Sequence, residues 1–201
     1  MTLHEPATFA TDCVLAVWSV WLGTRLKGST TAALWWRRTF FWTAAAGLSG
    51  GIYHGFGPSM ADAADGLWRG TLIAINITSL CLTLAAAHAT LKRGLAWCRA
   101  VAWVKAVCGV FYSMTHPVFL SAIIDYGSAM VFVLVVELYA WWGSGARHAR
   151  WVVAGILASV IGAAVQQLHW VPHPRFNHND LYHVIQMVGL WLFYRGARML
   201  S

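Results

Sequence analysis

The sequence predicts an all-α, polytopic membrane protein: a single domain over residues 1–201 that forms a seven-transmembrane helix bundle. Hydrophobic residues make up 59% of the 201-residue chain and charged residues only 10%, whereas soluble proteins carry about 25%. Thirteen Trp are present, and Trp collects at membrane–water interfaces. The chain lacks the long alternation of a β-barrel, and only helices or closed barrels can satisfy their backbone inside lipid.

Seven windows reach about 20 mainly apolar residues, the length that crosses the hydrocarbon core. The first ten residues contain no Lys or Arg, unlike the basic start of a signal peptide, so we expect the first apolar run to stay as a spanning helix. The connections are short, and we expect no domain outside the membrane. The predicted spans are residues 7–26, 39–57, 67–91, 95–115, 118–142, 151–170 and 180–200.

Orientation follows from the basic residues, because cytoplasmic loops carry the excess of Lys and Arg. Eleven of the 14 basic residues fall at one end of the predicted bundle, which places the N-terminus outside and the C-terminus in the cytoplasm. The net charge of +7 is then a sign of topology in a multi-pass protein of the cell or inner membrane, with no nucleic acid partner. The eleven are Arg25, Lys27, Arg37, Arg38, Lys92, Arg93, Arg99, Arg147, Arg150, Arg195 and Arg198.

Polar residues gather at the outer ends of the predicted helices, and ionisable residues at membrane depth are costly and usually functional. In helix 39–57, Gly47, Gly51 and Gly55 recur every four residues, which predicts a groove for close helix packing beside His54. Packing alone can explain this groove, with His54 reaching the interface. Alternatively, close packing lets the His54 imidazole reach side chains on other helices.

A His-rich segment leads into the last helix. Imidazole is the commonest metal ligand, and catalytic zinc takes three protein ligands and a water. On an ideal helix His178 and His183 lie about 140° apart, whereas Asn179 and His183 share a face. His178 can converge with His183 only if it precedes the helix, where Pro172 and Pro174 keep the chain extended. A wet interfacial loop without a specific role is the alternative.

Further ionisable residues of the predicted spans include Lys105, Glu137 and Asp12. Lys105 and Glu137 fall in the inner halves of adjacent helices, and we expect them to form an ion pair. Asp12 is expected to reach the lipid headgroups.

The arrangement resembles the superfamily of seven-helix membrane hydrolases that includes the alkaline ceramidases and the progestin/adipoQ receptors. Members of that superfamily hold zinc with one His on helix 2 and the two His of an HxxxH motif on helix 7. A Ser lies one turn before the first His, and an Asp follows on the way into helix 3. His54, Asp65 and His183 match three of these positions.

Two positions depart from the motif of that superfamily. Asn179 replaces the first His of HxxxH, with His178 one residue earlier. Gly50 replaces the Ser, with Ser49 one residue earlier.

The resemblance implies a zinc-dependent hydrolase that cleaves the amide or ester bond of a lipid, such as a ceramide-like substrate, in the outer half of the bundle. His54, His178 and His183 would hold zinc, which lowers the pKa of its bound water towards about 7 and polarises the carbonyl. Asp65 would orient the water or accept its proton, and Ser49 would donate to the oxyanion.

The alternative is a non-enzymatic transporter, sensor or receptor that uses the same pocket for ion or proton binding. A retinal protein is disfavoured because the last helix has no Lys, and a histidine-box desaturase because the required clusters are missing.

Overall fold

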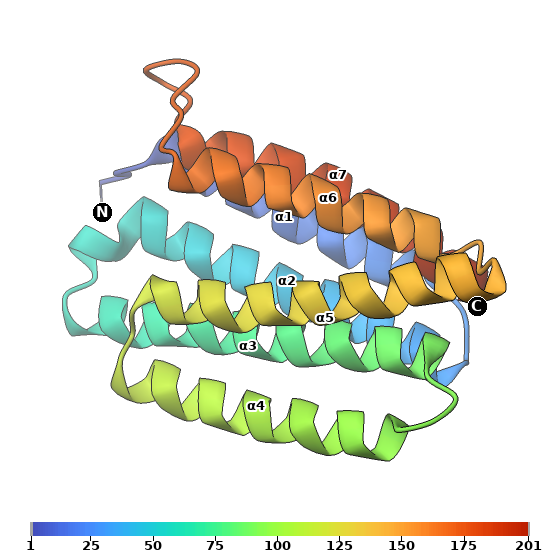
Figure 1. The fold of residues 1–201 in the computed structure, drawn as a ribbon. Helices are drawn as coiled ribbons and strands as arrows, with labels where there is room; N and C mark the ends of the chain where they lie inside the picture. The colour runs from blue at the N-terminus through green and yellow to red at the C-terminus, as the bar shows by residue number, and fades with distance from the viewer. Residues whose placement is uncertain (1, 201) are drawn as a thin grey trace.

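A computed structural model describes residues 2–200, which form seven long helices joined by short connections (Figure 1). No strand forms within these residues, although His173 and Phe176 make an isolated β-bridge in the loop before the last helix. The all-α prediction is confirmed. The helices are α1 Pro6–Arg25, α2 Thr31–Phe56, α3 Asp62–Thr90, α4 Leu95–Thr115, α5 Phe119–Ser144, α6 Ala149–Gln167 and α7 His178–Ala197, with 3-10 turns at Gly57–Ser59 and Arg198–Leu200.

Local sequence fixes several helix ends. Pro6 opens α1, where its missing N–H costs nothing. The Thr30 side chain accepts a hydrogen bond from the backbone N–H of Ala33 and caps α2. Asn177 and Asp180 form a reciprocal capping box at the start of α7. Gly145 ends α5 with a φ of +66°, in the left-handed region that glycine adopts without strain.

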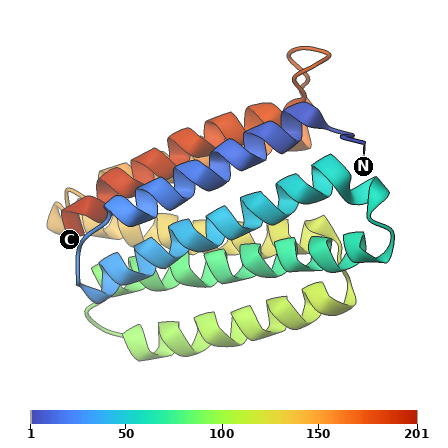
Figure 2. The same cartoon turned by 180° about the vertical axis from the view of Figure 1, so that it is seen from behind.

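Six helices form a closed ring in the order α1, α2, α3, α5, α6, α7, since each packs on the next and α7 packs on α1. The fourth helix lies outside this ring, against α3 and α5, and Figures 1 and 2 show it along one edge of the bundle. The N-terminus and the connections α2–α3, α4–α5 and α6–α7 share one end, which we call the N-terminal end. The C-terminus and the other connections share the opposite, C-terminal end.

The ring is filled by large apolar side chains over part of its length. Trp36, Phe40 and Phe193 are fully buried and lie in ring-to-ring contact as a chain of aromatic side chains, Trp36 with both of the others. Leu22 and Leu26, from the end of α1, belong to the same core. This core packs the C-terminal part of the ring and leaves space nearer the N-terminal end.

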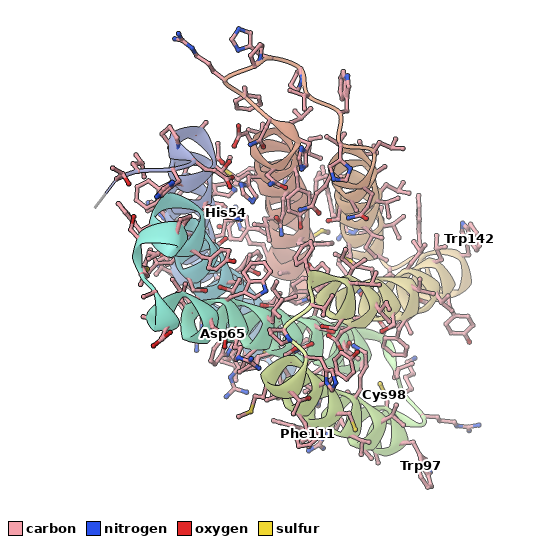
Figure 3. All side chains as sticks on the ribbon, turned by 90° about the vertical axis from the view of Figure 1, so that its left-hand side faces the viewer. His54, Asp65, Trp97, Cys98, Phe111 and Trp142 are labelled. Atoms are coloured by element: carbon pink, nitrogen blue, oxygen red, sulfur yellow. The ribbon has the colours of Figure 1, made fainter. Side chains whose placement is uncertain are left out.

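Five helices, namely α1, α3, α4, α5 and α6, are long and apolar enough to cross a membrane, which fits a multi-pass membrane protein. The outer surface is correspondingly apolar: Trp97, Phe111 and Trp142 project away from the bundle in Figure 3. The other two helices carry more polar side chains, such as Arg37 and Arg38 in α2. Seven spans, and the side on which each terminus lies, stay predictions.

The predicted helix bounds agree with the structure to within three residues at most ends. The exceptions are the start of α2, which lies eight residues before the predicted residue 39, and that of α3, five residues before the predicted 67. Both extensions contain charged residues that an apolar window excludes. A capping side chain, or the acidic first turn of α3, stabilises such an extension.

Candidate functional site

A cavity of about 540 Å³ lies inside the ring. All six ring helices line it, and α4 contributes none of its lining residues. Most of the lining is apolar, with polar side chains contributed by α1, α2, α3, α6 and α7. The volume falls in the range of about 300–1,000 Å³ that is typical of small-molecule sites. The polar lining residues are Asp12, Thr43, His54, Thr71, Thr78, Ser159, Gln166, Asn179, His183 and Gln186.

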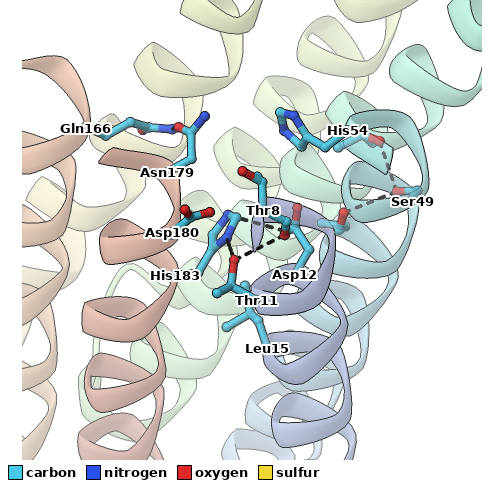
Figure 4. Close-up of polar contacts among 12 residues, drawn as sticks. Thr8, Thr11, Asp12, Leu15, Ser49, His54, Gln166, Asn179, Asp180 and His183 are labelled. Atoms are coloured by element: carbon cyan, nitrogen blue, oxygen red, sulfur yellow. Dashed lines mark hydrogen bonds and ion pairs between the residues drawn. The ribbon is translucent and has the colours of Figure 1, made fainter. Parts of the chain in front are cut away.

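The centre of the polar wall is a carboxylate–imidazole pair between α1 and α7 (Figure 4). His183 Nε2 lies 3.2 Å from Asp12 Oδ1, and His183 Nδ1 lies 3.0 Å from Thr11 Oγ1. Asp12 is 3% exposed and His183 is 7% exposed, so solvent screens the pair little. The second carboxylate oxygen of Asp12 has no hydrogen-bond partner among the described residues.

The neighbouring hydrogen bonds restrict where protons can lie in this pair. The Thr11 hydroxyl donates to the Thr8 carbonyl at 3.1 Å, so its oxygen must accept from His183 Nδ1–H. His183 Nε2 and Asp12 Oδ1 then share one proton, either as imidazolium and carboxylate or as neutral imidazole and carboxylic acid. The pair therefore holds one exchangeable proton at the wall of the cavity.

Close packing of α1 on α2 brings Asp12 to this wall. A Cβ added at Gly51 would lie 2.8 Å from Asp12 Cβ, and one added at Gly47 would lie 3.3 Å from the Asp12 carbonyl oxygen. Only glycine permits this approach. α1 therefore packs into the predicted glycine groove, and the prediction that these glycines allow close helix packing is confirmed.

His54 belongs to a second carboxylate–imidazole pair. Its Nδ1 lies 3.4 Å from Glu5 Oε2, and its ring lines the cavity. A carboxylate at Nδ1 favours the proton on that nitrogen and leaves Nε2 as the acceptor. The two imidazoles predicted to act together, His54 and His183, therefore line one cavity, each with its own carboxylate.

The start of α7 is held to α1 by further polar contacts. The Asn177 side chain donates to Thr8 Oγ1 at 3.2 Å and accepts from the backbone N–H of Asn179. Asp180 is fully buried and accepts the Asn177 N–H through Oδ2. Next to it, the Asn179 side chain lines the cavity and accepts a hydrogen bond from Gln166 of α6. The capping box thus fixes the register in which His183, one turn later, faces Asp12.

His178 lies apart from the cavity lining. It is the first residue of α7, and its ring packs in a tilted arrangement against that of His169, with the centroids 4.7 Å apart. The helix begins at His178 instead of after it, so the roughly 140° between His178 and His183 applies. The structure brings together two of the three predicted ligands and places the third against the preceding loop.

Asp65 and Ser49 also fall outside the cavity lining. Asp65 lies in the exposed first turns of α3, where it accepts a hydrogen bond from Arg69 at 2.8 Å (Figure 3). Ser49 donates to the Ala45 carbonyl and accepts from Thr71 Oγ1 at 3.0 Å. Thr71 itself lines the cavity, so Ser49 reaches the wall only through it.

The predicted pairing of Lys105 with Glu137 is wrong. Lys105 pairs with Asp125 at 2.8 Å, and Glu137 lies 3.3 Å from His148 Nε2. Because α4 and α5 are antiparallel and joined by residues 116–118 only, Asp125 lies closer than Glu137 to the level of Lys105 along the helix axis. The expectation for Asp12 is wrong as well, since this residue is buried inside the ring.

The sequence analysis missed Asp12 and Glu5 as site residues. The signal for Asp12 was present, because an acid inside an apolar span marks function by default. What the sequence could not show is that α1 lies between α2 and α7, which the ring order reveals.

A family model described as a family of unknown function, DUF6962, matches residues 7–201. The chain belongs to this family. None of the curated proteins or solved structures compared with the chain matches it. The match includes α1 from its second residue and continues through the 3-10 turn after α7, so family membership covers every cavity-lining helix.

Proposed function

We propose that this protein is a membrane-embedded hydrolase that cleaves an ester or amide bond of a membrane lipid. The observation that carries the proposal is a largely apolar cavity whose polar wall holds the Asp12–His183 pair and His54, whose imidazole is paired with Glu5 beside the cavity. The apolar part suits an acyl chain, and the polar wall suits the carbonyl and its attacking water. Paired imidazoles of this kind perform general acid–base catalysis.

The chemistry assigns one role to each pair. His54 Nε2 accepts a proton from a water molecule as the water oxygen bonds to the lipid carbonyl carbon. In the carboxylic acid form of the pair, movement of the shared proton to Asp12 Oδ2, which is unpartnered among the described residues, lets that hydroxyl donate a hydrogen bond to the carbonyl oxygen, which stabilises its developing negative charge. The tetrahedral adduct then breaks its carbon–oxygen or carbon–nitrogen bond, and the protonated His54 returns its proton to the leaving alcohol or amine. The products are a fatty acid and the alcohol or amine part of the lipid.

The ring offers the lipid a sideways entrance. Val131 of α5 and Val160 of α6 both line the cavity, and they are 63% and 55% exposed. Since both side chains line the cavity and are more than half exposed, we infer that the cavity opens between these two helices. An acyl chain can therefore pass between α5 and α6 directly from the bilayer.

Zinc is the cofactor that the sequence resemblance implies for this site. Within residues 2–200, no group of three or more His, Cys, Asp or Glu side chains is placed so that it could hold a metal ion. Both His183 nitrogens already face Thr11 and Asp12, and His178 lies against His169. The described arrangement does not fit the implied ligand set, and the steps above use only the protein's own side chains.

The experiment is a measurement of fatty acid release from a panel of ester- and amide-linked lipids by the purified protein in nanodiscs. We expect His54→Ala and Asp12→Asn each to lower the rate by about 10²–10⁴-fold, the usual contribution of a general acid or base. Asp65→Asn is the matched control, since it removes a carboxylate outside the cavity and should leave the rate unchanged. Equal rates in all four proteins, or no release by the wild type, would overturn the proposal.

A second candidate, a non-enzymatic proton- or ion-binding protein, is favoured by one observation: the Asp12–His183 pair is buried and holds a single proton. It predicts the opposite result in the same assay, with no fatty acid release. It also predicts proton uptake by protein-containing vesicles that Asp12→Asn abolishes.

A further inference from the structure

Four arginines lie at the C-terminal end of three neighbouring helices. Because α7 packs on both α1 and α6, these arginines are on adjoining helices at one side of the ring. All four are exposed, and none of them lines the cavity. We call them the arginine patch: Arg25 at the end of α1, Arg150 in the first turn of α6, Arg195 in the last turn of α7 and Arg198 in the 3-10 turn that follows.

One half of the arginine patch is arranged around Trp151 of α6. The Arg195 guanidinium lies over the Trp151 ring, 4.3 Å from its centroid, and that of Arg150 lies 5.5 Å from the same centroid. A guanidinium is attracted to the face of an aromatic ring, and this contact holds it in place while its N–H groups remain available to an anion. Trp151 therefore brings two guanidinium groups, one from α6 and one from α7, to the same ring.

The other half of the arginine patch lies where α1 meets α7. The Arg25 guanidinium is 5.3 Å from the Trp21 ring centroid, and that of Arg198 is 5.7 Å from the Tyr194 centroid. The Trp21 and Tyr194 centroids are 6.5 Å apart, so these two arginines lie on one aromatic pair. Arg195 and Arg198 are three residues apart, which is the spacing of neighbours on a helix surface. The two halves are therefore continuous.

The described part of the chain provides no counter-charge for the arginine patch. Within residues 2–200, none of its guanidinium groups forms a hydrogen bond or an ion pair. Of the seven acids, only Glu137 is in the C-terminal half of the bundle, and it is fully buried and lies 3.3 Å from His148 Nε2. Each guanidinium has five N–H donors. The positive charges of the patch and their donors are thus available to a ligand outside the protein.

We propose that the arginine patch is a binding site for an anionic phospholipid, whose phosphate accepts hydrogen bonds from the guanidinium groups. The ligand is a lipid because α1 and α6, which carry part of the patch at their ends, are long and apolar enough to cross a membrane, and Trp and Tyr rings gather at the membrane interface. Arginine binds phosphate through two parallel N–H···O bonds. The uncompensated positive charge favours an anionic over a zwitterionic headgroup, and basic pockets between spanning helices recognise anionic headgroups. This site is separate from the cavity, and it does not depend on hydrolase activity.

Native mass spectrometry tests the proposal on the full chain, taken from nanodiscs that contain equal amounts of phosphatidylglycerol and phosphatidylcholine. We expect the wild type to retain phosphatidylglycerol in preference to phosphatidylcholine. Arg195→Gln should weaken this retention roughly fivefold, the usual contribution of one basic residue at an anionic membrane surface. Arg93→Gln is the matched control, because it removes the same charge at the same end, in the connection between α3 and α4, and should leave the retention unchanged.

Equal losses in Arg195→Gln and Arg93→Gln would reveal only a general attraction to the basic end of the bundle and would overturn the proposal, as would equal retention of the two lipids by the wild type. Trp151→Leu keeps all the arginines of the patch and should still weaken retention of phosphatidylglycerol, because the ring no longer holds two of them in place. Glycerol phosphate in excess should not displace the bound lipid. Its displacement would identify a site for soluble phosphate and contradict the proposal.

Discussion

Replacing Gly51 by Ala tests how α1 is seated and, with it, the position of Asp12. The new Cβ would lie 2.8 Å from Asp12 Cβ, whereas ordinary contacts begin at 3.4 Å, so α1 and α2 must separate by about 0.6 Å to restore an ordinary contact. The atom that it meets is next to the backbone and cannot swing aside. Overpacking of this kind costs about 1–3 kcal/mol. Alanine also favours the helix by up to about 1 kcal/mol over glycine.

A matched variant separates these two effects. Gly70→Ala in α3 gains the same helix propensity but meets nothing within 4 Å. The difference in the free energy of unfolding between the two variants is then the clash alone, about 1–3 kcal/mol. For a chain of this size it corresponds to a difference of about 2–12 °C in melting temperature. Differential scanning fluorimetry in detergent measures it through the Trp residues. Equal melting temperatures for Gly51→Ala and Gly70→Ala would refute the close seating of α1.

Three further predictions concern the ring, the surface and the metal. Gly155→Ala should lower the melting temperature by several degrees, because its Cβ would lie 2.5 Å from Phe193 Cδ1; an unchanged value would contradict the packing of α6 on α7. Asp65→Asn should change the unfolding free energy by less than about 0.5 kcal/mol in a denaturant titration, because its pair with Arg69 is exposed. If zinc acts here, elemental analysis should find it in stoichiometric amount and chelation should stop lipid hydrolysis; activity that survives in metal-free protein supports the side-chain mechanism.

Much of the fold follows from composition and local pattern. Apolar runs of spanning length give the helices, and Thr30, Asn177 and Gly145 have the side chains or backbone freedom expected at helix ends. The glycine row of α2 correctly predicts a close helix contact. The position of α4 outside the ring does not follow from its sequence, because an apolar helix in lipid can face either neighbours or acyl chains.

The candidate site is only partly predictable for a related reason. His54 and His183 are near helix ends in a polar context, and the sequence predicts that they belong to one site; both line the cavity. The partners of Asp12 and Lys105 depend on which helices pack against each other, and one sequence alone does not contain that information. His178 lies away from the cavity because α7 begins at His178 itself and not one residue later. The exact residue at which a helix begins is the feature that a sequence pattern predicts least well.

The central claim is that a lipid acyl chain occupies the cavity with its polar group at Asp12 and His183. Photo-crosslinking measures this directly, with a lipid that carries a diazirine near its carbonyl, incorporated with the protein into nanodiscs and mapped by mass spectrometry. The account predicts labels on cavity residues such as Tyr126 and Tyr182, and their loss when an unlabelled single-chain lipid competes. Labels confined to the outer surface, for example on Trp103 and Phe111 of α4, would contradict it.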